Sequence, residues 1–406
     1  ISLVSDCLFN RFCSQNVFVI YLGGGEAGKK AADALMVLRI KPQVIYMNTD
    51  VVIVGAGLSG LMTAIRLADA GVRVQVLEAR SRIGGRILTV AADQGEGAFD
   101  LGPAWFWAHH VNVQRVMNEL GIAAFQQHET GVGVYDHGVG AEPQLFRPPP
   151  MAPSYRFVGG VQQLTERLAA RLPDGVIQLD TVVKRVKLFE DGVQISAENK
   201  HSPLTLHAKQ VVVTLPPRLI PATLAFEPSL PAELVAAMND TMTWMGQAMK
   251  VVLVYQTPFW RERRLSGFGF SHTGPVNEFR DHCSADGNTA ALFGWVGDAS
   301  VARQLSAEER RALIIKQAVR LFGNEAANLI GYDECNWAQQ PFTSQVGVTV
   351  PAATDHPQYG HPLLQGAAFS GRLHWAATET STVNGGYLDG AIVRAEQVTQ
   401  QIVATM

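Results

Sequence analysis

The chain is poor in the residues that build metal centres, disulfide frameworks and membrane spans. Its 406 residues include only four cysteines, Cys7, Cys13, Cys283 and Cys335, which show neither metal-ligand spacing nor a disulfide pattern. This cysteine usage favours a reducing compartment, so we expect a cytoplasmic protein. No apolar run approaches the length of a membrane span, and we therefore expect no transmembrane helix and no membrane partner.

Charge and reactive groups are also sparse. The formal net charge is −3, and no basic run with interleaved aromatic residues is present, which argues against nucleic-acid binding. No Ser-His-Asp set and no cluster of metal ligands stands out. Hydrophobic residues make up 47% of the chain and charged residues 17%, which indicates a globular protein with a large core.

One segment carries the strongest signal for a bound ligand. The β-branched run Val51–Val54 leads into Gly55-x-Gly57-x-x-Gly60, and the apolar residues 61–70 predict a helix directly afterwards. In such a motif the first glycine permits a tight turn, the second lets the backbone approach a pyrophosphate, and the third lets helix and strand pack closely. Free N–H groups at the start of the helix favour a phosphate there.

The residues that follow complete a βαβ unit. Residues 72–77 predict a second buried strand, and Glu78 lies at its end, where a carboxylate accepts hydrogen bonds from ribose hydroxyls. A lone glycine motif is weak evidence, but here both strands, the helix and the acid are in place. We therefore predict dinucleotide binding.

Two further glycine turns follow the acid. Ala79-Arg80 leads into Gly84-Gly85-Arg86, where backbone N–H and guanidinium groups can both reach a diphosphate. The alternative for this loop is a solvated basic turn, but its position after Glu78 favours ligand contact. Gly102-Pro103-Ala104-Trp105 is a glycine turn followed by aromatic residues, which belong either to the core or to the wall of a flat ligand site.

The first 46 residues are predicted to be an extension outside the fold. Gly23 to Lys29 nearly matches a phosphate-binding loop, but Lys30 stands where a Ser or Thr should hold Mg²⁺. We interpret this segment as a flexible, glycine-rich extension.

Downstream, periodicity predicts mixed helices and strands. Residues 127–154 are rich in Gly, Pro and His and predict a crossing loop. Helices are expected at 111–120, 155–172, 307–322 and 386–403, and strands at 176–179, 182–188, 193–197, 210–215 and 249–255.

Several motifs occur in an order that resembles one family. After the glycine motif at 55–60 come Gly84-Gly85-Arg86, Phe157-Val158-Gly159-Gly160, Lys250 with Pro258-Phe259-Trp260, Trp337, and Ala377-Thr378-Glu379-Thr380 with Gly386-Tyr387. Over about residues 48–403 the chain resembles the flavin-containing amine oxidases, the group with monoamine and polyamine oxidases. The resemblance implies an α/β fold, α+β overall, with a Rossmann-like FAD-binding domain and a second, smaller substrate domain that contains an antiparallel sheet.

The same resemblance implies a domain division. Residues 127–154 would replace most of the substrate-domain insertion of the family, and residues 236–338 would form the substrate domain. The FAD-binding domain would comprise 47–126, 155–235 and 339–406, with 1–46 outside it.

The implied cofactor is FAD. Glu78 would hold the adenosine ribose, and Val183 would contact the adenine region. Glu379 would face the diphosphate and ribityl, with Arg86 offsetting its charge; the alternative is an exposed surface acid. The other implied FAD contacts are Gly55, Gly57, Ser59, Gly60, Ala79, Arg80, Gly85, Arg86, Gly102, Pro103, Ala104, Trp105, Trp337, Gly386, Tyr387 and Leu388, and no metal site is expected.

Two residues match the family's catalytic positions. Lys250 matches the lysine that holds a water beside flavin N5, whereas the alternative is a lysine that extends to the surface. Tyr387 matches one of the two aromatic walls around the substrate amine, and its electron-rich ring favours a nearby amine. The second wall falls on Gly347, which has no ring, and Phe342 or Trp105 are the alternatives.

The chain departs from the family in three further respects. Val346 stands where monoamine oxidases carry the cysteine bonded to flavin, so we expect dissociable, non-covalent FAD. Without the long insertion, the cavity is expected to be more open or closed by a partner. Trp105 stands where amino-acid oxidases place a carboxylate-binding arginine, which argues against an α-amino acid substrate, and no cluster of acids clearly suits a polyamine.

The resemblance implies an FAD-dependent oxidoreductase whose partners are a small amine and O₂. A hydride equivalent would pass from the amine to flavin N5, the imine would hydrolyse to an aldehyde, and O₂ would reoxidise the flavin to give H₂O₂. The alternatives are an FAD-dependent oxidase or desaturase of a larger non-amine substrate or a reduced nicotinamide, and a non-catalytic flavoprotein. The oligomeric state is left open.

Overall fold

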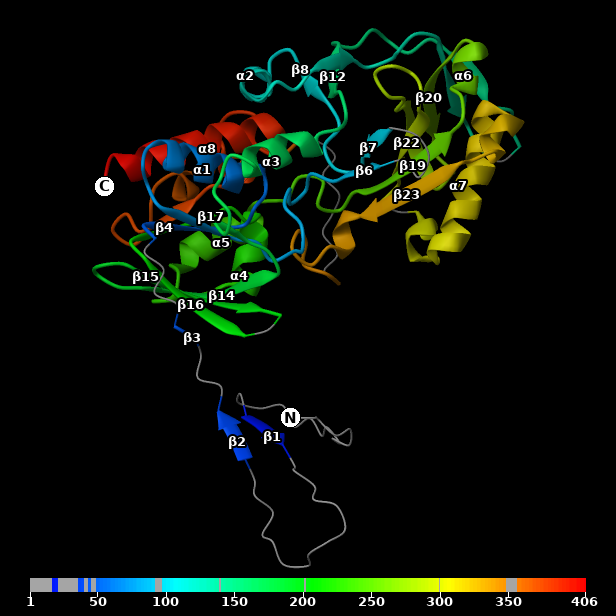
Figure 1. The fold of residues 1–406 in the computed structure, drawn as a ribbon. Coiled ribbons are helices and arrows are strands. Elements are labelled where there is room, and N and C mark those ends of the chain that lie inside the picture. The colour runs from blue at the N-terminus through cyan, green and yellow to red at the C-terminus, as the bar shows by residue number, and fades with distance from the viewer. Residues whose placement is uncertain are drawn as a thin grey trace, which may run out of the picture.

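The computed structural model describes residues 17–20, 36–39, 43–44, 49–91, 97–138, 140–200, 202–298, 300–347 and 356–406 (Figure 1). The glycine-rich segment from Gly23 to Lys29, together with Cys7 and Cys13, lies outside these described residues.

A five-stranded parallel sheet forms the centre of the predicted dinucleotide-binding part. Its order is β13-β5-β4-β17-β24, and every neighbouring pair is parallel. Every residue of β4 and β17 is buried, because both faces of the sheet are covered. The strands are β4 (Val51–Val54), β5 (Val74–Leu77), β13 (Ile177–Gln178), β17 (Gln210–Val213) and β24 (Leu373–Trp375).

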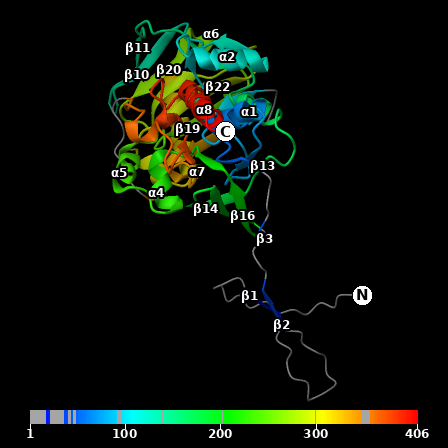
Figure 2. The same ribbon diagram turned by 90° about the vertical axis from the view of Figure 1, so that its left-hand side faces the viewer.

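Helices cover one face of this sheet. α1 (Leu58–Asp69) and α8 (Leu388–Val403) lie side by side in Figures 1 and 2, and their apolar faces share one core with α2 (Val111–Leu120) and α3 (Gln162–Ala169). The predicted βαβ unit is therefore confirmed. The helix begins three residues earlier than the predicted start at 61, because the N-terminal turn includes the glycine motif itself.

A second five-stranded sheet covers the opposite face. Its order is β18-β14-β15-β16-β3, and its apolar residues pack against β4, β17 and β24 in one core. The short strand β3 falls within the predicted extension and joins the edge of this sheet, whereas β1 and β2 pair with each other in a separate two-stranded sheet. The elements are β1 (Val17–Ile20), β2 (Met36–Arg39), β3 (Gln43–Val44), β14 (Thr181–Leu188), β15 (Val193–Asn199), β16 (Pro203–Ala208), β18 (Ala225–Glu227), α4 (Ile220–Thr223) and α5 (Ala232–Asp240).

A seven-stranded sheet of order β11-β10-β20-β21-β22-β19-β23 forms the other half of the molecule (Figure 1). One face packs on α7 (Ala307–Phe322), which begins with a capping box between Ser306 and Glu309. The other face packs on β6 and β7 through the core of Phe99 and Phe293. The strands are β6 (Thr89–Ala91), β7 (Ala98–Asp100), β10 (Val132–Asp136), β11 (Gln144–Phe146), β19 (Met249–Tyr255), β20 (Leu265–Ser271), β21 (Val276–Asp281), β22 (Ala290–Val296) and β23 (Gly331–Asn336), and α6 (Phe259–Glu262) follows β19.

Two secondary-structure predictions are wrong. Residues 127–154 are not only a crossing loop, because the strands β10 and β11 form there. β10 pairs with β20, so hydrogen bonds to the larger sheet stabilise these strands, which the local composition did not indicate. The helix predicted for 155–172 begins only at Gln162. β12 (Ser154–Phe157) precedes it, and Gly159 and Gly160 separate the two with φ of 77° and 87°.

The remaining small sheet joins β8 (Phe106–Trp107), β12 and β9 (Ala124–Gln126). Within the described ranges, none of the helices has the length and apolar character needed to cross a bilayer. The same part of the chain contains no grouping of His, Cys, Asp or Glu suited to a metal ion.

The close packing of α1 on β4 predicts a sharp contrast between two glycines. A Cβ on Gly60 would lie 2.0 Å from the Gly55 carbonyl oxygen, so Gly60→Ala should lower the free energy of unfolding by about 3 kcal/mol or more. Gly71 has φ of 79° but open space around it, so Gly71→Ala should cost only about 1–2 kcal/mol. Urea unfolding of both variants tests this, and equal losses would contradict the packing argument.

Candidate functional site

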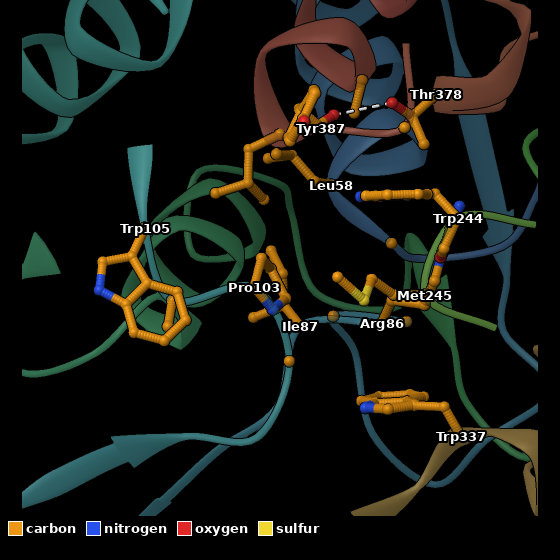
Figure 3. Close-up of a pocket in the computed structure, with 18 of the residues that line it drawn as sticks. Leu58, Arg86, Ile87, Pro103, Trp105, Trp244, Met245, Trp337, Thr378 and Tyr387 are labelled. Atoms are coloured by element: carbon orange, nitrogen blue, oxygen red, sulfur yellow. Dashed lines mark hydrogen bonds between the residues drawn. The ribbon is translucent and has the colours of Figure 1, made fainter. Parts of the chain in front are cut away.

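A cavity of about 640 Å³ lies between the parallel sheet and the seven-stranded sheet. Its wall includes the turns after β4 and β17, the loop after β5, the turn before β8, and the start of α8. These turns follow the carboxyl ends of parallel strands, which is where ligands bind in open α/β sheets. Figure 3 shows Tyr387, Trp244, Trp105, Pro103 and Trp337 arranged around this space.

Two glycine turns face each other at one end of the cavity. Gly57 and Gly84 form an isolated parallel bridge, and a Cβ on Gly57 would lie 3.9 Å from both the Gly84 oxygen and the Gly85 Cα. Gly57 is also the N-cap of α1 and carries no side chain to satisfy the first N–H groups of that helix. The backbone therefore presents donors and a partial positive charge without side-chain obstruction.

Two arginines flank these turns. Arg80 donates from Nη2 to the Thr343 hydroxyl at 2.8 Å, and its guanidinium lies 5.5 Å from the ring centroid of Phe342. Burial lowers the pKa of Arg80 to about 10, which leaves it charged at neutral pH. Arg82 donates to the carbonyls of Ile83, Gly85 and Ile87 and so holds the loop in shape.

Arg86 forms a buried ion pair with Glu379. Its two terminal nitrogens lie 2.5 and 2.9 Å from the two Glu379 oxygens, and Glu379 is fully buried. The pair also fixes Trp244, whose N–H donates to Glu379 at 3.3 Å and whose carbonyl accepts from Arg86 at 3.3 Å. The alternative of Glu379 as an exposed surface acid is therefore wrong.

Glu78 is held by the backbone. Its two oxygens accept from the Ala56 N–H at 2.7 Å and the Arg80 N–H at 2.8 Å, so the carboxylate lies between the two glycine turns. Val183 is buried on β14, and the Glu78 carbonyl accepts from the Thr181 N–H just before it. Glu78 and Val183 thus lie near each other, behind the cavity wall.

Lys250 is the cationic residue of the cavity floor. It is 4% exposed at the start of β19, and its Nζ donates to the Gly102 carbonyl at 2.5 Å. Burial lowers its pKa to about 8, although the nearby Asp100 carboxyl acts in the opposite direction. The alternative of a lysine extending to the surface is therefore wrong, and the Gly102 turn lies directly at the ammonium group.

Tyr387 lies at the centre of a group of rings. Its ring centroid is 6.3 Å from that of Trp244, 6.2 Å from Trp107 and 5.2 Å from His110, and His356 stacks on it at 4.6 Å. Tyr387, Trp244 and Trp107 also line the cavity. The start of α8 therefore presents an aromatic wall to this space.

The turn that carries Tyr387 is fixed from the other side by Asp389. One Asp389 oxygen accepts from the Asn112 and Val113 N–H groups at 2.8 and 3.0 Å, and the other accepts from the Asn384 amide at 2.8 Å. Because His110, the N-cap of α2, makes no side-chain cap bond, Asp389 of α8 satisfies the start of α2 instead.

Most predicted site residues meet in this one cavity. Those that line it are Gly55, Gly57, Ser59, Arg80, Gly85, Arg86, Gly102, Pro103, Ala104, Trp105, Lys250, Trp337, Gly386, Tyr387 and Leu388. Five predicted site residues do not line it, so their contacts with FAD stay predictions: Gly60, Glu78, Ala79, Val183 and Glu379.

The two alternatives for the second aromatic wall have other neighbours. Phe342 lies under Arg80, and Trp105 stacks on Trp295 at 5.4 Å while its Nε1–H donates to Gln127 at 2.8 Å. Among the described residues, none lies within 4 Å of a Cβ built on Gly347. Trp244 lies edge-on to Tyr387 and lines the cavity beside it, and sequence reasoning missed it.

Other lining residues were also missed. Thr214, Leu215 and Pro216 follow the carboxyl end of the parallel strand β17, and this position could have predicted ligand contact. Trp244 and Met245 lie in an irregular segment before β19, where no sequence periodicity predicts a contact with the cavity. The missed lining residues include Thr214, Leu215, Pro216, Trp244, Met245, Thr343 and Thr378.

Comparison with known proteins identifies the family. The model of the family described as flavin containing amine oxidoreductase matches residues 58–155 and 142–403. The chain belongs to this family. It is therefore an FAD-dependent oxidoreductase of the amine oxidase type. The model of the Thi4 family also matches residues 19–92, which include the glycine motif.

Individual relatives are distant but align along most of their length. The chain is 26% identical to putrescine oxidase of Kocuria rosea, over 88% of this chain and 95% of that protein. It is also 26% identical to a probable flavin-containing monoamine oxidase A of Dictyostelium discoideum, over 87% and 97%.

Solved structures confirm the predicted fold class. A variant of putrescine oxidase superposes with a TM-score of 0.75 at 23% identity, over 89% of this chain and all of that one. Cyclohexylamine oxidase from Brevibacterium oxydans IH-35A gives 0.73 at 20% identity, over 88% and 99%. The fold is thus that of a Rossmann-like FAD domain combined with a substrate domain.

The residues of the cavity fit FAD. Unobstructed backbone donors at Gly57 and Gly85, together with Arg80 and Arg86, suit a diphosphate, and aromatic and glycine walls suit a flat ring system. Neither of the cysteines in the described part of the chain, Cys283 and Cys335, lines the cavity.

The position of Glu78 predicts an effect on FAD affinity. Glu78→Ala removes an acceptor that organises both glycine turns, so the dissociation constant for FAD should rise roughly 10- to 100-fold. Fluorescence titration of the apoprotein measures this, with the exposed Glu190→Ala as a matched control. Equal affinities in the two variants would exclude the assigned role of Glu78.

The buried Lys250 predicts a pH dependence of stability. Its pKa is about 8 in the folded chain and 10.5 when unfolded, so between these values the unfolded state binds more protons. The free energy of unfolding of the wild-type apoprotein should therefore rise with pH across this window, relative to Lys250→Met. Urea unfolding of both proteins from about pH 7 to about pH 10 checks it. A constant or falling difference would contradict the burial of a charged Lys250.

Proposed function

We propose that this enzyme oxidises a neutral amine held beside Tyr387 and Lys250, with O₂ as the electron acceptor. For a primary amine the balanced reaction converts amine, O₂ and water into aldehyde, ammonia and H₂O₂. The observation that carries the proposal is that one cavity joins the diphosphate-type glycine turns, the buried Lys250 and the aromatic wall of Tyr387. The relatives named for amine oxidation support the same substrate class.

The cofactor and the residues that line the cavity would have separate roles in the reaction. Bound FAD supplies the two-electron oxidation of the amine and the return of those electrons to O₂. Tyr387 and Trp244 both line the cavity and would orient the amine there, and the surrounding aromatic residues would exclude water. Lys250 uses one N–H on Gly102, which leaves two donors for a water beside the reacting centre.

The cofactor is proposed to be dissociable. The position expected for a flavin-bound cysteine is Val346, which is 56% exposed, and both described cysteines lie behind the cavity wall. These two thiols are free and buried, which also supports a reducing, cytoplasmic location.

A division of labour between the two halves is also proposed. Segments 47–126, 155–235 and 339–406 would hold FAD, and segment 236–338 would shape the amine site through β19 and β22. The placement of the glycine turns in the first group and of Lys250 in the second supports this division.

The aromatic wall gives the test of function. Under anaerobic conditions, a primary amine should bleach the flavin absorbance and air should restore it with release of H₂O₂. Tyr387→Leu should lower kcat/KM about tenfold because an aromatic face for the amine is lost, whereas Tyr387→Phe should retain most of it. Flavin bands that no monoamine, diamine or polyamine bleaches would overturn the proposal.

A further inference from the structure

One face of the seven-stranded sheet forms a floor that runs outward from Lys250. Lys250 on β19 lies opposite Trp295 on β22, and Trp295 lies opposite Glu278 on β21. Directly opposed residues of neighbouring strands place their side chains on the same face. The row Lys250–Trp295–Glu278 therefore crosses the cavity floor, and all three residues line the cavity.

Arg280 lies at the outer end of this floor in a fixed orientation. Its Nε donates to Glu278 at 2.7 Å, and its guanidinium lies 4.0 Å from the ring centroid of Phe268. Its two terminal amino groups donate to no acceptor among the described residues. A guanidinium held by one ion pair and one stack, with its terminal fork free, is preorganised for bidentate binding of an oxyanion.

A second cavity, of about 550 Å³, shares Arg280, Glu129 and Met151 with the first. Arg147 and Arg264 also line it, and neither side chain is paired with an acid in the described part of the chain. Asp281 is neutralised by Arg261, and Glu278 is paired with Arg280. Glu129 is then the acid left to oppose the two unpaired guanidinium groups, those of Arg147 and Arg264.

From these observations we infer that the outer end of the cavity binds an oxyanion, so that the preferred substrate is an amine with a carboxylate at the far end of its chain. This inference rests on the proposed function for the amine end. The missing arginine near Trp105 is consistent with it, because the carboxylate binds at the outer end and not beside the amine carbon.

The sheet also gives the length of the substrate. Two strand spacings separate Lys250 from Glu278, which is about 10 Å. The side chains of Lys250 and Arg280 shorten the gap, so a linear chain of about six carbons spans it. An α-amino acid is far too short to reach both ends.

Three probes of equal length isolate the charge at the far end. These are hexylamine, 1,6-diaminohexane and 6-aminohexanoate, compared through KM and kcat in aerobic turnover, followed by the release of H₂O₂. The expected result is a KM for 6-aminohexanoate about tenfold below that of hexylamine, with similar kcat. The lowest KM for 1,6-diaminohexane would overturn the inference, because Glu129 and Glu278 would then bind an ammonium group. Equal KM values for all three would overturn it as well.

Two substitutions separate the arginine from its acid partner. Arg280→Gln should raise the KM for 6-aminohexanoate about tenfold and leave that of hexylamine unchanged, whereas Lys316→Gln, an exposed change of the same charge on α7, should alter neither. Glu278→Gln retains an acceptor oxygen for the Arg280 Nε–H but removes a negative charge near the carboxylate, so it should leave the KM for 6-aminohexanoate unchanged or lower it. A rise with Glu278→Gln, or no change with Arg280→Gln, would overturn the inference.

A binding measurement distinguishes failure of this site from failure of the proposed function. Hexanoate carries the carboxylate without the amine, and its binding is followed by perturbation of the flavin spectrum. If no amine bleaches the flavin but Arg280→Gln weakens hexanoate binding, the oxyanion site stands and amine oxidation fails. If amines bleach the flavin and hexanoate binds equally to both proteins, the oxyanion site fails alone.

Discussion

The buried ion pair between Arg86 and Glu379 holds the site together. Isolated burial of a carboxylate costs several kcal/mol, so Glu379 is tolerated because the guanidinium faces both of its oxygens. The pair connects the loop after β5 to the segment before α8. Through the backbone of Trp244 it also connects both to the half of the chain that contains the seven-stranded sheet. Three distant segments thus share one polar centre beside the cavity.

The sequence predicted those parts of the site whose geometry is set by residues close together in the chain. The positions of Gly57 and Gly60 follow from backbone approach and helix packing within one βαβ unit, and the structure forms that unit. Ribose recognition by Glu78 stays a prediction, because both of its oxygens accept backbone N–H groups in the structure. Family resemblance added Lys250 and Tyr387, whose roles no periodicity specifies, and the structure places both in the same cavity. The Arg86–Glu379 pair was expected on the simple ground that an acid near phosphates needs a counter-charge.

Contacts between distant segments were not predictable in this way. Trp244 lies edge-on to Tyr387, and the Arg86–Glu379 pair, which comes from two other segments, fixes its backbone. Glu129 and Arg280 come from a loop and a strand far apart in the chain, yet they line the same two cavities. Residues 127–154 had the composition of a loop, but β10 and β11 form there because the edge of an existing sheet offers unpaired backbone groups.

The Asp389 carboxylate affects how much conformational entropy the protein loses when a substrate binds. It is completely buried and accepts hydrogen bonds from the start of α2 and from the turn before Tyr387. The Tyr387 backbone is thereby fixed on both sides before any ligand arrives. An incoming amine then finds its aromatic neighbour already immobilised, so binding loses little conformational entropy in the protein and a larger share of the contact energy appears as affinity.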